Sequence, residues 1–121
     1  GAQFIFYPTA IGYQDADLPE LNKQVAAWET AQKAHAISNG VFIAAVNRVG
    51  REDALTFWGR SFVCDPFGEI IAQAGDSESE NLIVKCDLSK IEQTRQDWPF
   101  LRDRRIDAYQ NLTQIYDDPH A

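Results

Sequence analysis

Cys64 and Cys86 are the two thiols of this sequence, and a cysteine is well suited to nucleophilic catalysis. A catalytic thiol needs a histidine, a lysine or a helix N-terminus to lower its pKa, and a partly exposed position. Cys64 is instead followed directly by Asp65, whose carboxylate would raise the pKa of the thiol. Cys86 alternates with Leu82 and Val84 in an apolar strand pattern. We therefore interpret both cysteines as small buried strand residues, and we predict no catalytic residue in this chain.

The other candidate groups predict neither a metal site nor a phosphate site. The two histidines have no partners at ligand spacing, and we interpret His35 as packed or at an interface and His120 as part of a polar tail. The carboxylates of Asp76, Glu78 and Glu80 lie in one loop, where a solvated face is the ordinary role. Neither a Gly-x-Ser-x-Gly pattern nor a glycine-rich phosphate loop is present. The residues alone thus indicate a domain without a self-contained active site.

Composition and charge exclude several classes of protein. The 121 residues are 45% hydrophobic and 12% aromatic, which is typical of one folded domain. A net charge of −7 argues against nucleic-acid binding, which needs clustered basic residues. No run approaches the roughly 18 apolar residues of a membrane helix, and no signal-peptide pattern opens the chain. With no cysteine framework for disulfides, we expect a cytoplasmic protein with reduced thiols and no membrane partner.

One basic cluster remains, near the C-terminal end of the chain. It consists of Arg102, Arg104 and Arg105, interrupted by Asp103 and followed by Asp107. We interpret it as a salt-bridged surface or interface stretch rather than a phosphate site.

Hydrophobic patterning predicts an α/β layer with its helices outside the sheet. Pro8 to Leu18 and Arg51 to Thr56 are predicted loops, Asp65 to Gly68 is a predicted turn, and Ser89 and Glu92 have capping-box spacing. The predicted strands are residues 4–7, 41–46, 61–64, 69–73 and 81–86, and the predicted helices are residues 21–39, 87–97 and 102–116. Such a layer would form half of a sandwich more naturally than a complete one.

The first predicted helix carries two stripes. We expect Asp17 as its N-cap and Gly40 as its left-handed end. The bulky stripe is Leu21, Val25 and Trp28, and the small stripe is Ala27, Ala31, Ala34 and Ser38. The small stripe either packs against the chain's own sheet or forms a second buried face against a partner subunit.

Several motifs, in this order, resemble the nitrilase, or carbon–nitrogen hydrolase, superfamily. They are Gly-Ala-Gln-Phe-Ile-Phe-Tyr-Pro-Thr-Ala-Ile-Gly at 1–12, Ala-His-Ala-Ile-Ser-Asn-Gly at 34–40, Ala-Val-Asn-Arg-Val-Gly at 45–50, Phe-Trp-Gly-Arg-Ser-Phe at 57–62, Asp-Pro-Phe-Gly-Glu at 65–69 and Trp-Pro-Phe-Leu-Arg-Asp-Arg-Arg-Ile-Asp-Ala-Tyr at 98–109. The pairing of Tyr-Pro-Thr-Ala-Ile-Gly with Arg-Asp-Arg-Arg most resembles the N-carbamoylputrescine amidase branch.

The resemblance implies a fold, a mechanism and a partner. The fold is the C-terminal half of a four-layer αββα sandwich, with residues 1–121 as the C-terminal portion of a single hydrolase domain and a second copy as partner in a homo-oligomer. The mechanism uses a Glu–Lys–Cys triad without metal or cofactor. In that family the triad precedes the segment matching Gly1 and Ala2, so we expect it upstream of this chain. The absence of methionine and the apolar opening at Phe4 likewise favour a chain that begins within a domain.

The residues that the resemblance assigns to this chain are pocket wall. Thr9, Ala10 and Ile11 match the loop that lines the substrate pocket. The next residues depart from the branch, and Asp15 or Asp17 either faces a substrate ammonium or lies in a solvated loop.

We therefore expect part of a hydrolase acting on a linear amide or N-carbamoyl amine, with a role in polyamine biosynthesis, whose 121-residue fragment is inactive alone. A second hypothesis is a non-catalytic assembly module that retains the fold. A third is an independent cysteine enzyme that uses Cys64.

Overall fold

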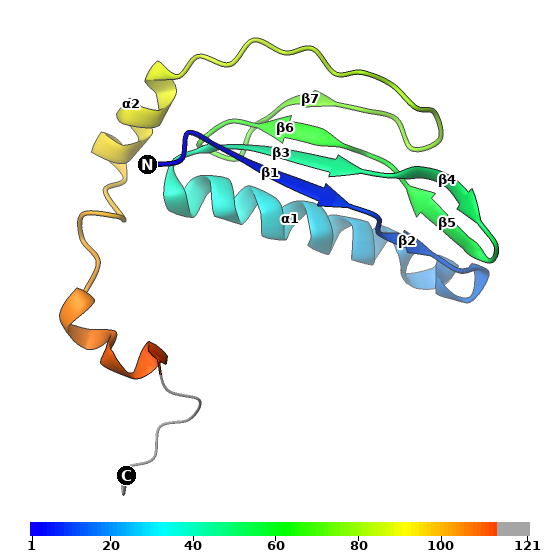
Figure 1. Cartoon of the computed structure of the whole chain (residues 1–121), viewed down its shortest axis with the longest axis horizontal. Helices are drawn as coiled ribbons and strands as arrows, with labels where there is room; N and C mark the ends of the chain where they lie inside the picture. The colour runs from blue at the N-terminus through cyan, green and yellow to red at the C-terminus, as the bar shows by residue number, and fades with distance from the viewer. Residues whose placement is uncertain (114–121) are drawn as a thin grey trace, which may run out of the picture.

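The structure is a computed structural model that describes residues 1–113. The chain forms two sheets, with one long helix against the larger sheet and a C-terminal arm that leads away from it (Figure 1). No helix in this part of the chain is both long and apolar enough to cross a membrane. The strands and α-helices are β1 (Phe4–Thr9), β2 (Gly12–Tyr13), α1 (Leu21–Asn39), β3 (Phe42–Asn47), β4 (Val49–Glu52), β5 (Leu55–Trp58), β6 (Phe62–Cys64), β7 (Ile70–Gln73) and α2 (Ser89–Asp97).

The larger sheet has the strand order β1-β3-β6-β7, and the smaller sheet has the order β2-β5-β4. β1 and β3 run parallel, with Phe4 opposite Phe42 and Thr9 opposite Asn47, because α1 carries the chain back between them. All other pairs are antiparallel. The predicted α/β class is confirmed.

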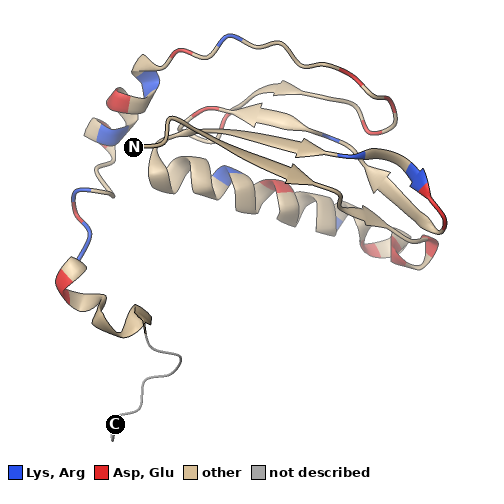
Figure 2. Cartoon of the chain, viewed as in Figure 1, with Lys and Arg blue, Asp and Glu red and all other residues tan. Residues whose placement is uncertain are grey.

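The core lies between α1 and one face of the larger sheet. Trp28 of α1 meets the rings of Trp58 and Phe62 edge-on, with centroids 6.2 and 5.5 Å away. Figure 2 shows few charged residues on the strands themselves, which fits their buried positions. The buried cluster is Ala36, Val41, Ile43, Ala45, Phe62 and Cys64.

The opposite face of the larger sheet stays apolar but open. Phe4 stacks on Phe42 at 5.1 Å and on Phe6 at 6.1 Å. Phe6 is 66% exposed and Val46 is 50% exposed. Strand alternation puts these residues on the side away from α1.

α1 has the predicted bounds, and Gly40 ends it in the left-handed conformation at φ 57°. The bulky stripe faces the sheet, with Val25 buried, whereas the small stripe is exposed in this chain. The small stripe therefore does not pack against the chain's own sheet. Asp17 is not the N-cap of α1, because a 3₁₀ helix (Asp15–Glu20) precedes it and Glu20 is the residue before α1.

The predicted loop over residues 51–56 is wrong. β4 and β5 form a hairpin there, in which Glu52 pairs with Leu55 and Asp53 turns the chain at φ 51°. Asp tolerates this left-handed conformation. The predicted loop over residues 8–18 also contains the end of β1, all of β2 and part of the 3₁₀ helix.

The predicted strand at residues 81–86 is wrong as well, although its alternation is real. Leu82 and Val84 are half-buried and Ile83 is 97% exposed, but no described strand pairs with this segment. Figure 1 shows it as an extended trace leading to α2. The expected capping box of α2 is absent, because Ser89 Oγ donates to Asp87 Oδ1 instead.

The described part of the helix predicted over residues 102–116, residues 102–113, instead contains two short 3₁₀ turns, Ile106–Ala108 and Gln110–Thr113. Ile106 is 73% exposed and Leu112 is 77% exposed, so this arm has no packing surface, and an isolated helix of this length is marginal in water. The expected ion pairs are present, since Arg102 Nε lies 2.8 Å from Asp103 Oδ1 and Arg105 Nε donates to Asp107. Residues 114–116 and His120 lie outside the described residues.

The predicted turn at Asp65 is confirmed by a hydrogen bond from Gly68 N to Asp65 O at 2.8 Å. The buried Asp65 side chain accepts from the amides of Phe67 and Glu69 through Oδ1, and its Oδ2 lies 2.9 Å from Lys90 Nζ. The carboxylate raises the pKa of Lys90 by hydrogen bonding and by charge. One side chain thus joins the β6–β7 turn to α2.

Removing the Asp65 carboxylate should loosen this junction in two separable steps. Asp65→Asn keeps an acceptor for the turn amides but loses the ion pair, and should lower the free energy of unfolding by about 1 kcal/mol. Asp65→Ala also leaves two amides unpaired and should cost about 2–4 kcal/mol. Urea unfolding measures both. Asp76→Asn in an exposed loop is the control, and equal losses for Asp65→Asn and Asp76→Asn would contradict the assignment.

Candidate functional site

The predicted pocket wall lies where the larger sheet bends into the smaller one. β1 continues into β2 through residues 10 and 11, β3 continues into β4 through Arg48, and β5 continues into β6 through residues 59–61. β1 and β3 are parallel, so their carboxyl ends meet at this bend. Open α/β sheets bind ligands beyond the carboxyl ends of their strands.

Asn47, the last residue of β3, holds the loop at residues 9–11. Its Oδ1 accepts from Thr9 Oγ1 at 2.9 Å and from Ile11 N at 3.0 Å. Its Nδ2 donates to Ile11 O at 3.1 Å. The Thr9 carbonyl accepts from Arg48 N at 3.1 Å, so backbone and side chain act together.

The same side chain also reaches the third crossing strand. Asn47 Nδ2 donates to Gly59 O at 3.0 Å, and the main chain of Asn47 exchanges two hydrogen bonds with Ser61 Oγ, at 2.9 and 3.1 Å. An amide has two donors and two acceptor positions, and here all four are used. Asn47 is 7% exposed, so each of these bonds is largely shielded from water.

Two glycines allow the strands to approach this closely. A Cβ on Gly12 would lie 2.3 Å from the Thr56 carbonyl oxygen, which is backbone and cannot move aside. Gly59 takes φ 58°, and a Cβ there would lie 2.6 Å from Val49 Cγ1. The left-handed conformation and the lack of room for a Cβ both require glycine at residue 59.

The structure places the three predicted wall residues on one loop. Thr9 is half-buried with its hydroxyl engaged by Asn47, Ala10 is exposed, and Ile11 is 37% exposed. Asp17 accepts a hydrogen bond from Gln14 N at 2.9 Å, whereas Asp15 is exposed. Their contact with a substrate stays a prediction.

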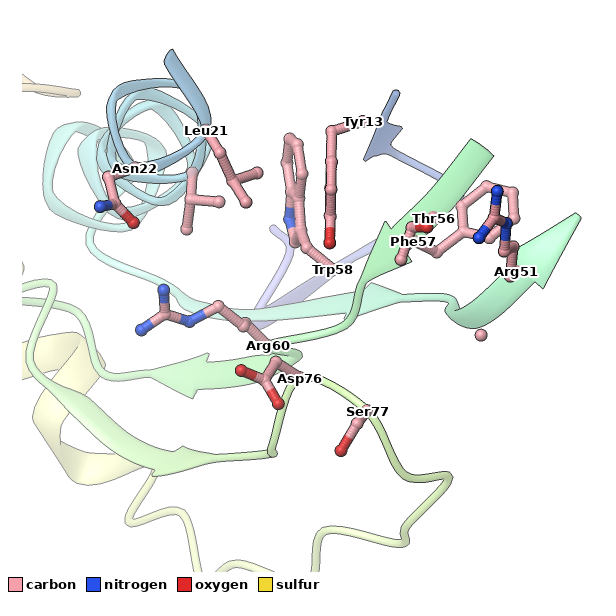
Figure 3. A pocket seen from close by; sticks show the side chains of 12 residues that line it. Tyr13, Leu21, Asn22, Arg51, Thr56, Phe57, Trp58, Arg60, Asp76 and Ser77 are labelled. Atoms are coloured by element: carbon pink, nitrogen blue, oxygen red, sulfur yellow. The ribbon is translucent and has the colours of Figure 1, made fainter. Parts of the chain in front are cut away.

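A separate hollow of about 510 Å³ lies between the start of α1 and the β4–β5 hairpin. Figure 3 shows the rings of Tyr13 and Trp58 on one wall and the side chain of Arg60 reaching toward α1, with Asp76 beside it. Arg60 takes φ 56° at the strand crossing. None of the three wall residues lines this hollow.

Both cysteines are free, and they differ in exposure. Cys64 lies in β6, fully buried in the core as the sequence predicts. Burial raises the pKa of its thiol to about 11, and the Asp65 carboxylate adds to that rise. Cys86 is half-buried and burial raises its pKa too, but it lies outside any strand.

The remaining titratable groups do not gather. Within residues 1–113, no three His, Cys, Asp or Glu side chains are close enough to hold a metal ion. His35 lies on the exposed side of α1, with its ring 6.0 Å from that of Tyr7. Asp76, Glu78 and Glu80 are exposed in their loop, as the sequence predicts.

Sequence reasoning missed Asn47, which appeared only as part of the motif at residues 45–50. One signal was available in the sequence, because Asn47 directly follows the predicted strand at residues 41–46 and Thr9 comes shortly after the predicted strand at residues 4–7. The third partner, Gly59, is 12 residues away across a hairpin that was not predicted.

Comparison with known proteins gives a consistent result. The carbon–nitrogen hydrolase family model matches residues 1–96. The chain is 40% identical over 125 residues to the N-carbamoylputrescine amidase of Solanum tuberosum, covering 95% of this chain and 40% of that protein. The chain thus spans about 40% of the length of the curated relatives that it matches first.

Two solved structures share the fold. A carbon–nitrogen hydrolase from Helicobacter pylori superposes with a TM-score of 0.91 at 45% identity, covering 97% of this chain and 43% of that one. An amidase from Nesterenkonia sp. AN1, with the acetamide moiety of fluoroacetamide bound covalently at its active-site cysteine, superposes with a TM-score of 0.62 at 27% identity, covering 92% of this chain and 35% of that one.

Thiol titration should separate the two cysteines of this chain. At pH 8, a disulfide reagent such as DTNB should label Cys86 first and Cys64 only as the protein unfolds, because Cys64 is fully buried with a pKa of about 11, whereas Cys86 is only half-buried. Since folding raises the Cys64 pKa, its contribution to stability is complete below pH about 9 and declines as the pH rises toward 11.

Cys86→Ser is the matched control, because it should remove the fast labelling phase and leave the slow one. Fast labelling of Cys64 in the folded Cys86→Ser protein would contradict this assignment and revive Cys64 as a candidate nucleophile.

Proposed function

The chain belongs to the carbon–nitrogen hydrolase family, and from that membership we propose that the protein carrying it cleaves the C–N bond of a linear amide or N-carbamoyl amine. The match to N-carbamoylputrescine amidases at 38–40% identity is the observation that carries the proposal. Hydrolysis of N-carbamoylputrescine would yield putrescine, ammonia and carbon dioxide, so with that substrate the activity would belong to polyamine biosynthesis. Two free cysteines support a reducing compartment such as the cytoplasm.

In this proposal the Glu–Lys–Cys triad lies outside residues 1–121, which form the C-terminal portion of one domain. The active-site cysteine of the Nesterenkonia amidase supports a thiol mechanism, and Cys64 is a poor candidate because it is buried with a raised pKa. The thiolate would attack the carbonyl carbon, an amine or ammonia would leave, and water would release the acyl group. The mechanism needs no metal or cofactor.

The proposed contribution of this chain is part of the pocket wall. The loop of Thr9, Ala10 and Ile11 is held at the sheet bend, and Ala10 and Ile11 are exposed there. A small amide or carbamoyl substrate lying beyond the carboxyl ends of β1 and β3 would contact these residues.

The full-length protein should release ammonia from N-carbamoylputrescine, and the 121-residue chain alone should not. Cys64→Ala in the full-length protein should change kcat/KM by no more than about twofold, because the thiol is buried in the core and cannot contact a substrate. Coupled detection of ammonia measures the activity of the full-length protein, of the isolated chain and of the Cys64→Ala variant. Turnover by the isolated chain that Cys64→Ser abolishes would refute the placement of the nucleophile.

A non-catalytic assembly module is the second candidate, and the exposed small-residue face of α1 is compatible with it. The coding sequence ahead of Gly1 discriminates between the two. A Cys-Trp-Asp-type turn there, with a glutamate and a lysine further upstream, favours the enzyme, and their absence favours the module.

We further propose a homo-oligomer that buries the small stripe of α1. Ala31→Arg would place a long cation in the exposed small stripe and should convert the full-length oligomer to a smaller species. Light scattering measures the mass of that species. Ala26→Arg, also exposed but on the flank of α1, is the matched control. Unchanged mass for Ala31→Arg would exclude this face as an interface.

A further inference from the structure

The amide of Asn47 has the geometry of a positioning group for the pocket-wall loop. Three of its four hydrogen bonds go to that loop, two with Ile11 and one with Thr9. The fourth goes to Gly59 on the neighbouring strand crossing. The loop is therefore fixed relative to two strands of the larger sheet through one buried side chain.

The orientation of this amide is determined by its partners. Oδ1 faces an N–H and a hydroxyl, whereas Nδ2 faces two carbonyl oxygens, so the flipped amide would set an acceptor against two acceptors. Aspartate has nearly the same shape but no donor at the second position. At residue 47 an ionised aspartate would therefore repel the carbonyls of Ile11 and Gly59 while still accepting from Thr9.

We propose that Asn47 is a positioning residue for catalysis, which fixes the loop of residues 9–11 against the substrate. The inference rests on the proposed function of that loop as pocket wall. A misplaced wall weakens the contacts made to the bound substrate and leaves the chemistry at a nucleophile outside this chain intact. The expected signature is thus a change in KM with little change in the reactivity of the nucleophile.

The test uses the full-length protein with Asn47→Asp, Asn47→Ala and Thr9→Val. KM for N-carbamoylputrescine should rise about tenfold or more in both Asn47 variants, and less in Thr9→Val, which removes only one of the four bonds of the Asn47 amide. The rate of inactivation by iodoacetamide should stay within about twofold of wild type, because it reports the nucleophile alone. Lowering the pH should partly restore KM for Asn47→Asp only, because a protonated carboxyl regains one donor.

Hydrogen exchange at the Ile11 amide provides a readout that does not depend on activity. Its protection should fall in Asn47→Ala and persist in Asn81→Ala, an exposed asparagine in the loop after β7. Unchanged KM and unchanged Ile11 protection in the Asn47 variants would overturn the proposal, and so would loss of thermal stability with KM unchanged. If Asn47→Ala does not fold, Asn47→Asp and Thr9→Val carry the same comparison.

The two proposals fail in different ways. A wild-type protein without amidase activity would refute the proposed function, and Ile11 protection would still report whether Asn47 fixes the loop. If the wild type is active and substitution of Asn47 leaves KM unchanged, only the positioning role is refuted.

Discussion

The bend between the two sheets depends on the side-chain amide of Asn47. Three strands cross that bend, and the amide joins the crossing loops of two of them to the end of the third. A single buried hydrogen bond contributes only about 1 kcal/mol net, but a buried group left unpaired costs about 1–3 kcal/mol. Loss of this one side chain would therefore leave several buried groups unpaired at once. Gly12 and Gly59 permit the arrangement by leaving room for the neighbouring backbone.

Contacts elsewhere in the fold hold the strands on either side of that bend in place. α1 covers one face of the larger sheet, where Trp28 packs against rings on β5 and β6, one strand from each sheet. Aromatic contacts across the two sheets limit their relative motion more than aliphatic contacts would, because edge-to-face rings have a preferred geometry. At the far end, Asp65 ties the β6–β7 turn to α2. Rigid elements thus hold residues 10 and 11, which have no regular secondary structure of their own.

Local sequence patterns predicted the features that depend on neighbouring residues alone. The limits of α1 followed from apolar spacing and from Gly40, and the turn at Asp65 followed from Asp-Pro-Phe-Gly. Residues 81–86 alternate correctly but lack a partner strand, and the arm after residue 101 has helical spacing but no surface to pack on. Both errors concern the segment or surface on which an element must pack, and sequence periodicity gives no information about that. Asn47 escaped notice for the same reason, since its importance arises from Ile11 and Gly59, which are remote in sequence.

The uncovered face and the edge strands of the larger sheet favour association between copies of the chain. β1 and β7 are the edge strands of this sheet among the described residues, and Phe6 and Val46 lie exposed on its uncovered face. Unpaired strand edges beside apolar surface are templates for strand addition between molecules. Produced separately, the chain should self-associate as its concentration rises, so its refolding yield should improve on dilution. During synthesis at the ribosome, the same face would promote aggregation until another part of the protein or a partner subunit covers it.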